Sequence, residues 1–128
     1  MVGLDQDEHG PVLVVEDDYG ARDGIRKLIE LGGYAVETAA SGAEALRKLR
    51  AGLRPCIIIL DLAMNDGSGF SFREAQLKDP QLADIPVIIQ SGIYDVKSAA
   101  VQLGAVAYFR KPFEIDHILS AIHEHAQK

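Results

Sequence analysis

The sequence predicts an α/β fold, in which a parallel sheet of five strands is covered by helices on both faces. Three observations support this fold class. Short apolar runs rich in β-branched residues occur five times along the chain. Segments with helical spacing lie between them, and strands that alternate with helices build a parallel sheet. The length of 128 residues suffices for one domain with a substantial core and not for two.

The five predicted strands are short, and two of them are apolar throughout. They are expected at residues 12–15, 35–38, 57–60, 87–89 and 106–109. The first reads Val-Leu-Val-Val and the third reads Ile-Ile-Ile-Leu. Continuous apolar strands are typical of the centre of a parallel sheet, where both faces are buried.

The first two helices are predicted from their apolar spacing and their ends. The first carries one apolar face made of Ala21, Ile25, Leu28 and Ile29. Gly32-Gly33 can end this helix in a left-handed conformation. The second begins at a capping box, in which the Ser41 hydroxyl accepts from the N–H of Glu44 and the Glu44 side chain reaches back.

The last three helices have equally clear boundaries. The third ends at Asp79-Pro80, because the residue before a proline avoids helical angles. Gly104 closes the fourth. In the fifth, apolar residues repeat at i, i+3, i+4 and i+7, namely Ile115, Ile118, Leu119 and Ile122.

Composition narrows the classes of function. The formal net charge of −6 argues against broad electrostatic binding of nucleic acid, which needs clustered lysines and arginines. No apolar run approaches the roughly 20 residues that span a bilayer. Residues 1–10 are acidic and resemble no secretory signal, so we expect a flexible tail followed by one domain over residues 11–128. The single cysteine, Cys56, is expected to be buried and reduced, and a cytoplasmic location is expected.

Acidic side chains follow two strands that are expected to be neighbours. Glu16 and Asp17 come directly after the first strand, and Asp61 follows the third. In parallel sheets of this kind, ligands bind outside the carboxyl ends of the strands. Three carboxylates brought together there repel one another unless a cation compensates them, and hard oxygen ligands suit Mg²⁺. Asp18 is expected only to cap the following helix.

A hydroxyl and an ammonium group follow two further strands. Ser91, followed by Gly92, can donate to a phosphoryl oxygen. Lys111 precedes Pro112-Phe113, a rigid step that can aim its side chain over the sheet edge. There it can offset the acidic residues or bind a phosphoryl oxygen. Taken alone, Ser91 is equally consistent with a serine that only forms part of a turn.

The motifs at the strand ends match those of a known family. They are Val12-Leu13-Val14-Val15-Glu16-Asp17, Ile58-Ile59-Leu60-Asp61-Leu62-Ala63-Met64, Asp66-Gly67-Ser68-Gly69-Phe70, Pro86-Val87-Ile88-Ile89-Gln90-Ser91-Gly92 and Lys111-Pro112-Phe113. In this order and spacing, they resemble the receiver domain of two-component response regulators. The resemblance covers about residues 11–126 and is greatest to single-domain, chemotaxis-regulator-like forms. It implies the flavodoxin-like receiver fold, with five helices and the strand order 2-1-3-4-5.

The resemblance also implies a role for each residue of the candidate site. Asp61 would be the phosphoacceptor. Mg²⁺ would be held by Asp17, Asp61 and the backbone carbonyl of Ala63, with Glu16 acting mostly through water. Ser91 and Lys111 would hold the phosphoryl oxygens. Tyr108 would change rotamer as Ser91 moves, and the surface of the fourth helix, last strand and last helix would change with it.

The implied partners are a sensor histidine kinase or phosphotransfer protein and a downstream protein target. Direct binding of nucleic acid or membrane is not expected, and the domain is expected to be a monomer or weak dimer. It would be no enzyme in the usual sense, although it would catalyse its own phosphorylation and slow dephosphorylation. Three alternatives remain: a receiver-like interaction module that is never phosphorylated, a flavodoxin-like FMN protein, and an aspartate-nucleophile phosphatase. Ala63, where such phosphatases carry an acidic residue, argues against the last.

Overall fold

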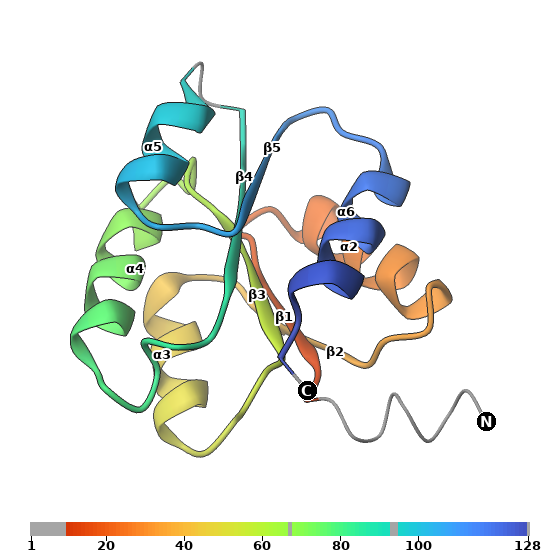
Figure 1. Cartoon of the computed structure of the whole chain (residues 1–128). Helices are drawn as coiled ribbons and strands as arrows, with labels where there is room; N and C mark the ends of the chain where they lie inside the picture. Colours follow the sequence, from red (N-terminus) through yellow and green to blue (C-terminus); the bar gives the residue numbers. More distant parts are fainter. Residues whose placement is uncertain (1–9, 67, 93–94, 128) are drawn as a thin grey trace.

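Strands and helices alternate along the chain as the sequence predicts (Figure 1). The computed structural model describes residues 10–66, 68–92 and 95–127, so most of the expected tail, residues 1–9, lies outside the described residues. The strands are β1 (Val12–Val15), β2 (Val36–Ala39), β3 (Ile57–Asp61), β4 (Val87–Ser91) and β5 (Ala107–Arg110). The helices are α2 (Tyr19–Leu31), α3 (Gly42–Arg50), α4 (Ser68–Lys78), α5 (Val96–Gln102) and α6 (Ile115–His125).

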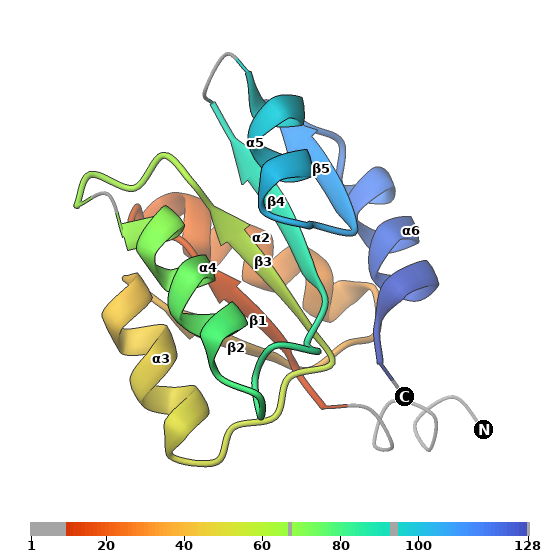
Figure 2. The same cartoon turned by 60° about the vertical axis from the view of Figure 1, so that its left-hand side comes forward.

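The five strands form one parallel sheet in the order β2-β1-β3-β4-β5, which confirms the predicted order. Helices α3, α4 and α5 cover one face, and α2 and α6 cover the other (Figures 1 and 2). All strands run in the same direction, so their carboxyl ends meet at one edge of the sheet. None of the described helices has the length and apolar character needed to cross a bilayer.

Side chains alternate between two separate cores along each strand. Leu13 and Val15 of β1 face the core beneath α3, α4 and α5, whereas Val12 and Val14 face the core beneath α2 and α6. The residues of β1 and the apolar residues of β3 are fully buried, as expected for central strands. This alternation continues past the last apolar residue of each strand and therefore decides which way the polar side chains point.

Four of the five predicted strands differ from the observed strands by one or two residues. Both β2 and β5 begin one residue later than predicted, and β3 and β4 extend to include Asp61 and Ser91. The extension has a simple cause, since a ladder is built from backbone groups and a polar side chain does not end it. Asp61 pairs with Gln90, and Ser91 pairs with Arg110.

The predicted helix ends are largely confirmed. Gly33, beyond the end of α2, has a φ of 102°. Ser41 accepts from the N–H of Glu44 at 3.1 Å, but Glu44 reaches back to the N–H of Ala40 at 3.0 Å. The reciprocal bond therefore goes one residue earlier than in the predicted capping box. Asp18 caps α2 by accepting from the third residue along, at 2.8 Å.

A buried polar network joins α4 to the end of α5. Arg73 is 4% exposed and Gln76 is fully buried. Arg73 donates from Nε to the carbonyl of Leu103 at 2.9 Å, from Nη2 to that of Gly104 at 3.2 Å, and from Nη1 to Gln76 Oε1 at 2.7 Å. Gln76 in turn donates to two carbonyls of the segment before β4. The network therefore fixes the C-terminal end of α5 against α4.

Candidate functional site

The predicted site residues meet at the carboxyl edge of the sheet. Glu16 and Asp17 follow β1 directly, and Asp61 and Ser91 are the last residues of β3 and β4. Lys111 follows β5, and its backbone N–H donates to the carbonyl of Ser91 at 3.0 Å. The peptide bond between Lys111 and Pro112 is cis. The expected convergence of these four strand ends is thus confirmed.

Glu16, Asp17 and Asp61 form a compact acidic cluster. Each offers a carboxylate oxygen, and these oxygens lie within 4.8 Å of one another. Glu16 and Asp61 are each 2% exposed, whereas Asp17 is half-buried at the rim. Backbone groups hold two of them in place, since Asp17 Oδ2 accepts from the N–H of Asn65 at 2.8 Å and Asp61 Oδ1 accepts from that of Ala63 at 2.9 Å. Hard oxygen donors at this spacing fit Mg²⁺.

The ammonium group of Lys111 lies between two of the carboxylates. Its Nζ donates to Glu16 Oε2 at 2.8 Å and to Asp61 Oδ2 at 3.1 Å. Strand alternation explains this meeting, because both acidic residues point to the α2 and α6 side of the sheet. The lysine therefore compensates two buried negative charges with one positive charge, and a net negative charge remains.

Burial and charge pairing shift the pKa values of Glu16 and Lys111 in opposite directions. Burial raises the pKa of Glu16, and the hydrogen bond from Lys111 only partly offsets it, because Asp61 adds repulsion. Burial acts to lower the pKa of Lys111, but hydrogen bonds to Glu16 and Asp61 outweigh burial and raise it. Lys111 therefore stays charged, whereas keeping Glu16 ionised in the folded state costs free energy.

Replacing Glu16 with glutamine is expected to raise the free energy of unfolding of the metal-free protein by about 1–2 kcal/mol at pH 7. A raised pKa means that this group stabilises the fold below pH 4.5, the ordinary glutamate value, and that this contribution is lost as the pH rises through the folded pKa. Glutamine does not ionise and avoids the loss. Urea unfolding in EDTA at pH 4 and pH 7 checks the prediction, which is wrong if Glu16→Gln gains no stability at pH 7.

Two residues of the site, Arg22 and Gln90, were not predicted from the sequence. Arg22 on α2 donates from Nη1 to the carbonyls of Glu16 and Asp17, at 2.9 and 3.4 Å, and so holds the loop that carries both carboxylates. Gln90 on β4 donates to Glu16 Oε2 at 3.4 Å. Strand alternation was a usable signal for Gln90, because it places this residue on the same face as Asp61 in the neighbouring strand. No comparable signal pointed to Arg22.

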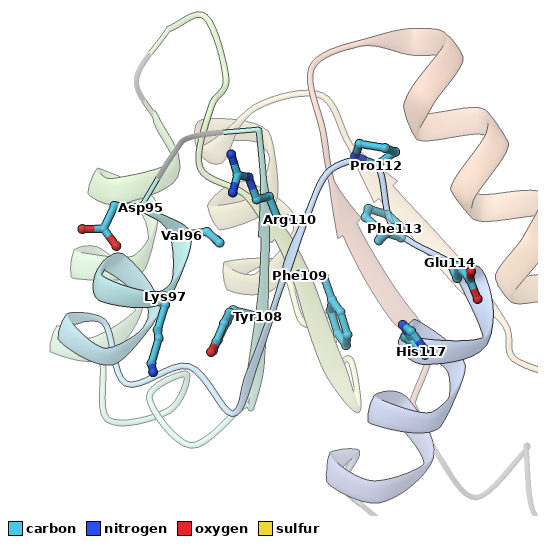
Figure 3. A pocket seen from close by; sticks show the side chains of 10 residues that line it. All are labelled: Asp95, Val96, Lys97, Tyr108, Phe109, Arg110, Pro112, Phe113, Glu114 and His117. Atoms are coloured by element: carbon cyan, nitrogen blue, oxygen red, sulfur yellow. The ribbon is translucent and has the colours of Figure 1, made fainter.

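The two predicted switch residues lie on neighbouring strands. Ser91 is fully buried, and Tyr108 on β5 is 40% exposed and pairs with Ile89, two residues before Ser91. Figure 3 shows Tyr108 on the α5 side of β5 and Phe109 on the α6 side. A groove of about 480 Å³ runs beside them and is lined by residues of α5, β5 and the start of α6. Ser91 does not line this groove, but it pairs with Arg110, which does.

The fold and the site define a class of signalling domain, and comparison with known proteins names it. The family described as response regulator receiver domain matches residues 12–123, and the chain belongs to this family. Its members are regulators in two-component systems, as the sequence motifs predicted. The order of strands and the convergence of site residues agree with that assignment.

Two curated relatives illustrate the family. The chain is 35% identical over 123 residues to the acid tolerance regulatory protein ActR of Rhizobium meliloti, covering 92% of this chain and 62% of that protein. It is 29% identical over 113 residues to the DNA-binding dual master transcriptional regulator RpaA of a Synechocystis strain, covering 87% of this chain and 46% of that protein. The chain thus spans about half to three fifths of the length of these relatives.

Solved structures agree with this assignment. The chemotaxis protein CheY4 of Vibrio cholerae matches with a TM-score of 0.80 and 29% identity, over 91% of this chain and 98% of that chain. A CheY-like receiver domain protein from Methanospirillum hungatei matches with a TM-score of 0.80 and 26% identity, over 91% and 92% of the two chains. The predicted receiver fold is therefore confirmed.

Proposed function

We propose that this domain accepts a phosphoryl group on Asp61 from a histidine kinase or phosphotransfer protein, with Mg²⁺ held by the acidic cluster. One observation carries the proposal: the Lys111 ammonium lies within hydrogen-bond distance of buried Asp61, beside carboxylates spaced for a divalent cation. Phosphoryl transfer needs an in-line nucleophile, positioning and charge compensation, and little other covalent chemistry. Asp61 at the end of β3 is the nucleophile, whereas Lys111 after β5 and the cation-binding carboxylates after β1 provide positioning and charge compensation.

The chain's own residues have distinct roles in the transfer. An oxygen of Asp61 attacks phosphorus while the bond from phosphorus to the donor histidine nitrogen breaks, and that nitrogen keeps the bonding electron pair. The ammonium of Lys111, 3.1 Å from Asp61 Oδ2, offsets the negative charge of the attacking carboxylate. Asp17, Asp61 and the carbonyl of Ala63 would hold Mg²⁺, with Glu16 acting mostly through water, and the ion would neutralise charge on the transferred group. Because the carboxylate itself is the nucleophile, no general base is needed.

The acyl phosphate would then change the surface beyond β4 and β5. It adds negative charge and acceptor oxygens next to Asp61. Lys111 and Ser91 are the donors for these oxygens. Movement of Ser91 would alter the packing beside Tyr108 and reshape the groove between α5 and α6, where a downstream protein docks (Figure 3). The domain therefore acts as a switch that accelerates its own phosphorylation.

Intact mass after incubation with Mg²⁺ and acetyl phosphate tests the proposal. One added phosphate is expected in the wild type, none in Asp61→Asn, and none in the wild type when EDTA replaces Mg²⁺. Asp84→Asn is the matched control, because Asp84 is exposed near the opposite edge of the sheet, where its carbonyl accepts from Gln127, and should not affect incorporation. Absence of phosphate from the wild type would favour an interaction module that is never phosphorylated. Undiminished incorporation in Asp61→Asn would show that another residue is the acceptor.

A further inference from the structure

Gln90 is a buried amide near the carboxyl end of β4. It is 1% exposed, pairs with Asp61 across the strands, and shares its face of β4 with Ile88. Burying an amide costs free energy unless both its donor and its acceptor are hydrogen-bonded. A leucine would fill the same place without that cost. The fold alone therefore gives no reason for a glutamine at this position.

The contacts of Gln90 connect it to the phosphorylation site. Its Nε2 donates to Glu16 Oε2 at 3.4 Å, the same oxygen that accepts from Lys111 Nζ at 2.8 Å. Its Oε1 is buried and has no hydrogen-bond partner among the described residues. Gln90, Glu16 and Lys111 line one cavity of about 470 Å³. The amide thus offers an acceptor that the resting contacts leave unused.

We propose that Gln90 is a positioning residue that holds Glu16 in place while Lys111 turns toward the phosphoryl group. This inference rests on the proposed function. At rest, Lys111 is shared between Glu16 and Asp61. A phosphoryl group on Asp61 draws the ammonium toward its own oxygens, and Glu16 Oε2 then loses part of its contact with Lys111, its cationic partner among the described residues.

The backbone N–H of Asp18 donates to the other oxygen, Glu16 Oε1, at 3.3 Å, so the loss falls on Oε2. A buried carboxylate oxygen without a donor is costly, and this loss would oppose phosphorylation. The Gln90 amide keeps a donor on Glu16 Oε2 throughout the change. Its unused Oε1 is an acceptor in the cavity that Lys111 also lines, and it can accept a hydrogen bond from the ammonium as the lysine turns. Gln90 therefore lowers the cost of moving Lys111, without touching the phosphoryl group itself.

A double-mutant cycle on the rate of phosphorylation tests this role. The rate of phosphate incorporation from acetyl phosphate is measured by intact mass in wild type, Gln90→Leu, Glu16→Gln and the double variant. We expect Gln90→Leu to slow the wild type about fivefold to tenfold, as for loss of one hydrogen bond of ordinary strength, because the bond to Glu16 is long, at 3.4 Å. In the Glu16→Gln background the same change should slow the rate less than twofold, because a neutral amide at position 16 needs no second donor.

Gln102→Leu is the matched control, because Gln102 is exposed on α5, and this change should leave the rate unchanged.

Two further readouts separate positioning from packing. Gln90→Leu should unfold at the same temperature as the wild type or higher, since it removes a buried unpaired acceptor. The Gln90 side-chain amide resonance in NMR spectra, assigned by its loss in Gln90→Leu, should shift in metal-free Glu16→Gln. Equal slowing in both backgrounds, or an unchanged rate in Gln90→Leu while the wild type is phosphorylated, would overturn the inference alone. A wild type that takes no phosphate would overturn the proposed function and this inference with it.

Discussion

Replacing Lys111 with methionine is expected to lower the free energy of unfolding by about 3–5 kcal/mol at neutral pH without divalent metal. The reason is the position of its ammonium, 2.8 Å from Glu16 Oε2 and 3.1 Å from Asp61 Oδ2. The side chains of these partners are only 2% and 3% exposed, so water compensates poorly for the lost cation. Methionine keeps most of the apolar stem and removes the ammonium, with its charge and its two hydrogen bonds.

Metal should reverse much of this loss. Mg²⁺ brings positive charge to the same carboxylates, so its addition should stabilise Lys111→Met more than the wild type. Urea unfolding with EDTA and with Mg²⁺ measures both effects. Lys78→Met is the control, because Lys78 is 80% exposed on α4 and its pairing at 3.9 Å with Glu74 contributes little. A metal-free Lys111→Met protein within 1 kcal/mol of the wild type, or one that Mg²⁺ does not stabilise, would contradict this account of the site.

Replacing Arg73 with leucine is expected to lower the free energy of unfolding by about 2–3 kcal/mol. The change removes three hydrogen bonds at once and leaves the buried Oε1 of Gln76 and the carbonyls of Leu103 and Gly104 without these donors. Removing the buried charge itself recovers part of the loss, because burial disfavours the charged guanidinium and lowers the pKa of Arg73. The net effect is therefore smaller than for Lys111.

The effect of Arg73→Leu should be concentrated at the end of α5. Amide hydrogen exchange is expected to speed up for the last turn of α5 and the residues after it, and much less for β1 and β3. Arg50→Leu is the control, because Arg50 is exposed on α3 and should change stability by no more than about 0.5 kcal/mol. A stable Arg73→Leu protein with unchanged exchange in α5 would show that the network does not hold this helix.

The parts of the fold that depend on local pattern were predictable from the sequence. The apolar runs of β1 and β3 identify central strands, because only burial on both faces explains unbroken Val, Leu and Ile. The meeting of Glu16, Asp61 and Lys111 also follows, since carboxyl ends of parallel strands share one edge. The apolar pattern could not predict where each strand ends. Backbone pairing continues through Asp61 and Ser91, because it does not depend on the side chain.

The partners of buried polar groups could not be read from the sequence. Arg73 meets Leu103, thirty residues further along the chain, and this depends on how α4 packs beside α5. Arg22 contacts the carbonyls of Glu16 and Asp17 only because α2 folds back beside the loop before it. For Gln90, the alternation along β4 predicts the face of the sheet on which the side chain lies, but not that its amide donates to Glu16. Contacts of this kind are set by tertiary packing and not by local spacing.

Chemical trapping of the phosphorylated residue tests the central claim most directly. Borohydride reduces an aspartyl phosphate to homoserine, because a first hydride adds at the acyl carbon and displaces phosphate, and a second hydride reduces the resulting aldehyde to the alcohol. Wild-type protein treated with Mg²⁺ and acetyl phosphate, then with borohydride, should yield homoserine at position 61 when its peptides are sequenced by mass spectrometry, and none when acetyl phosphate is omitted. Homoserine at another position, or phosphorylated protein without homoserine at 61, would contradict the assignment of Asp61 as the phosphoacceptor.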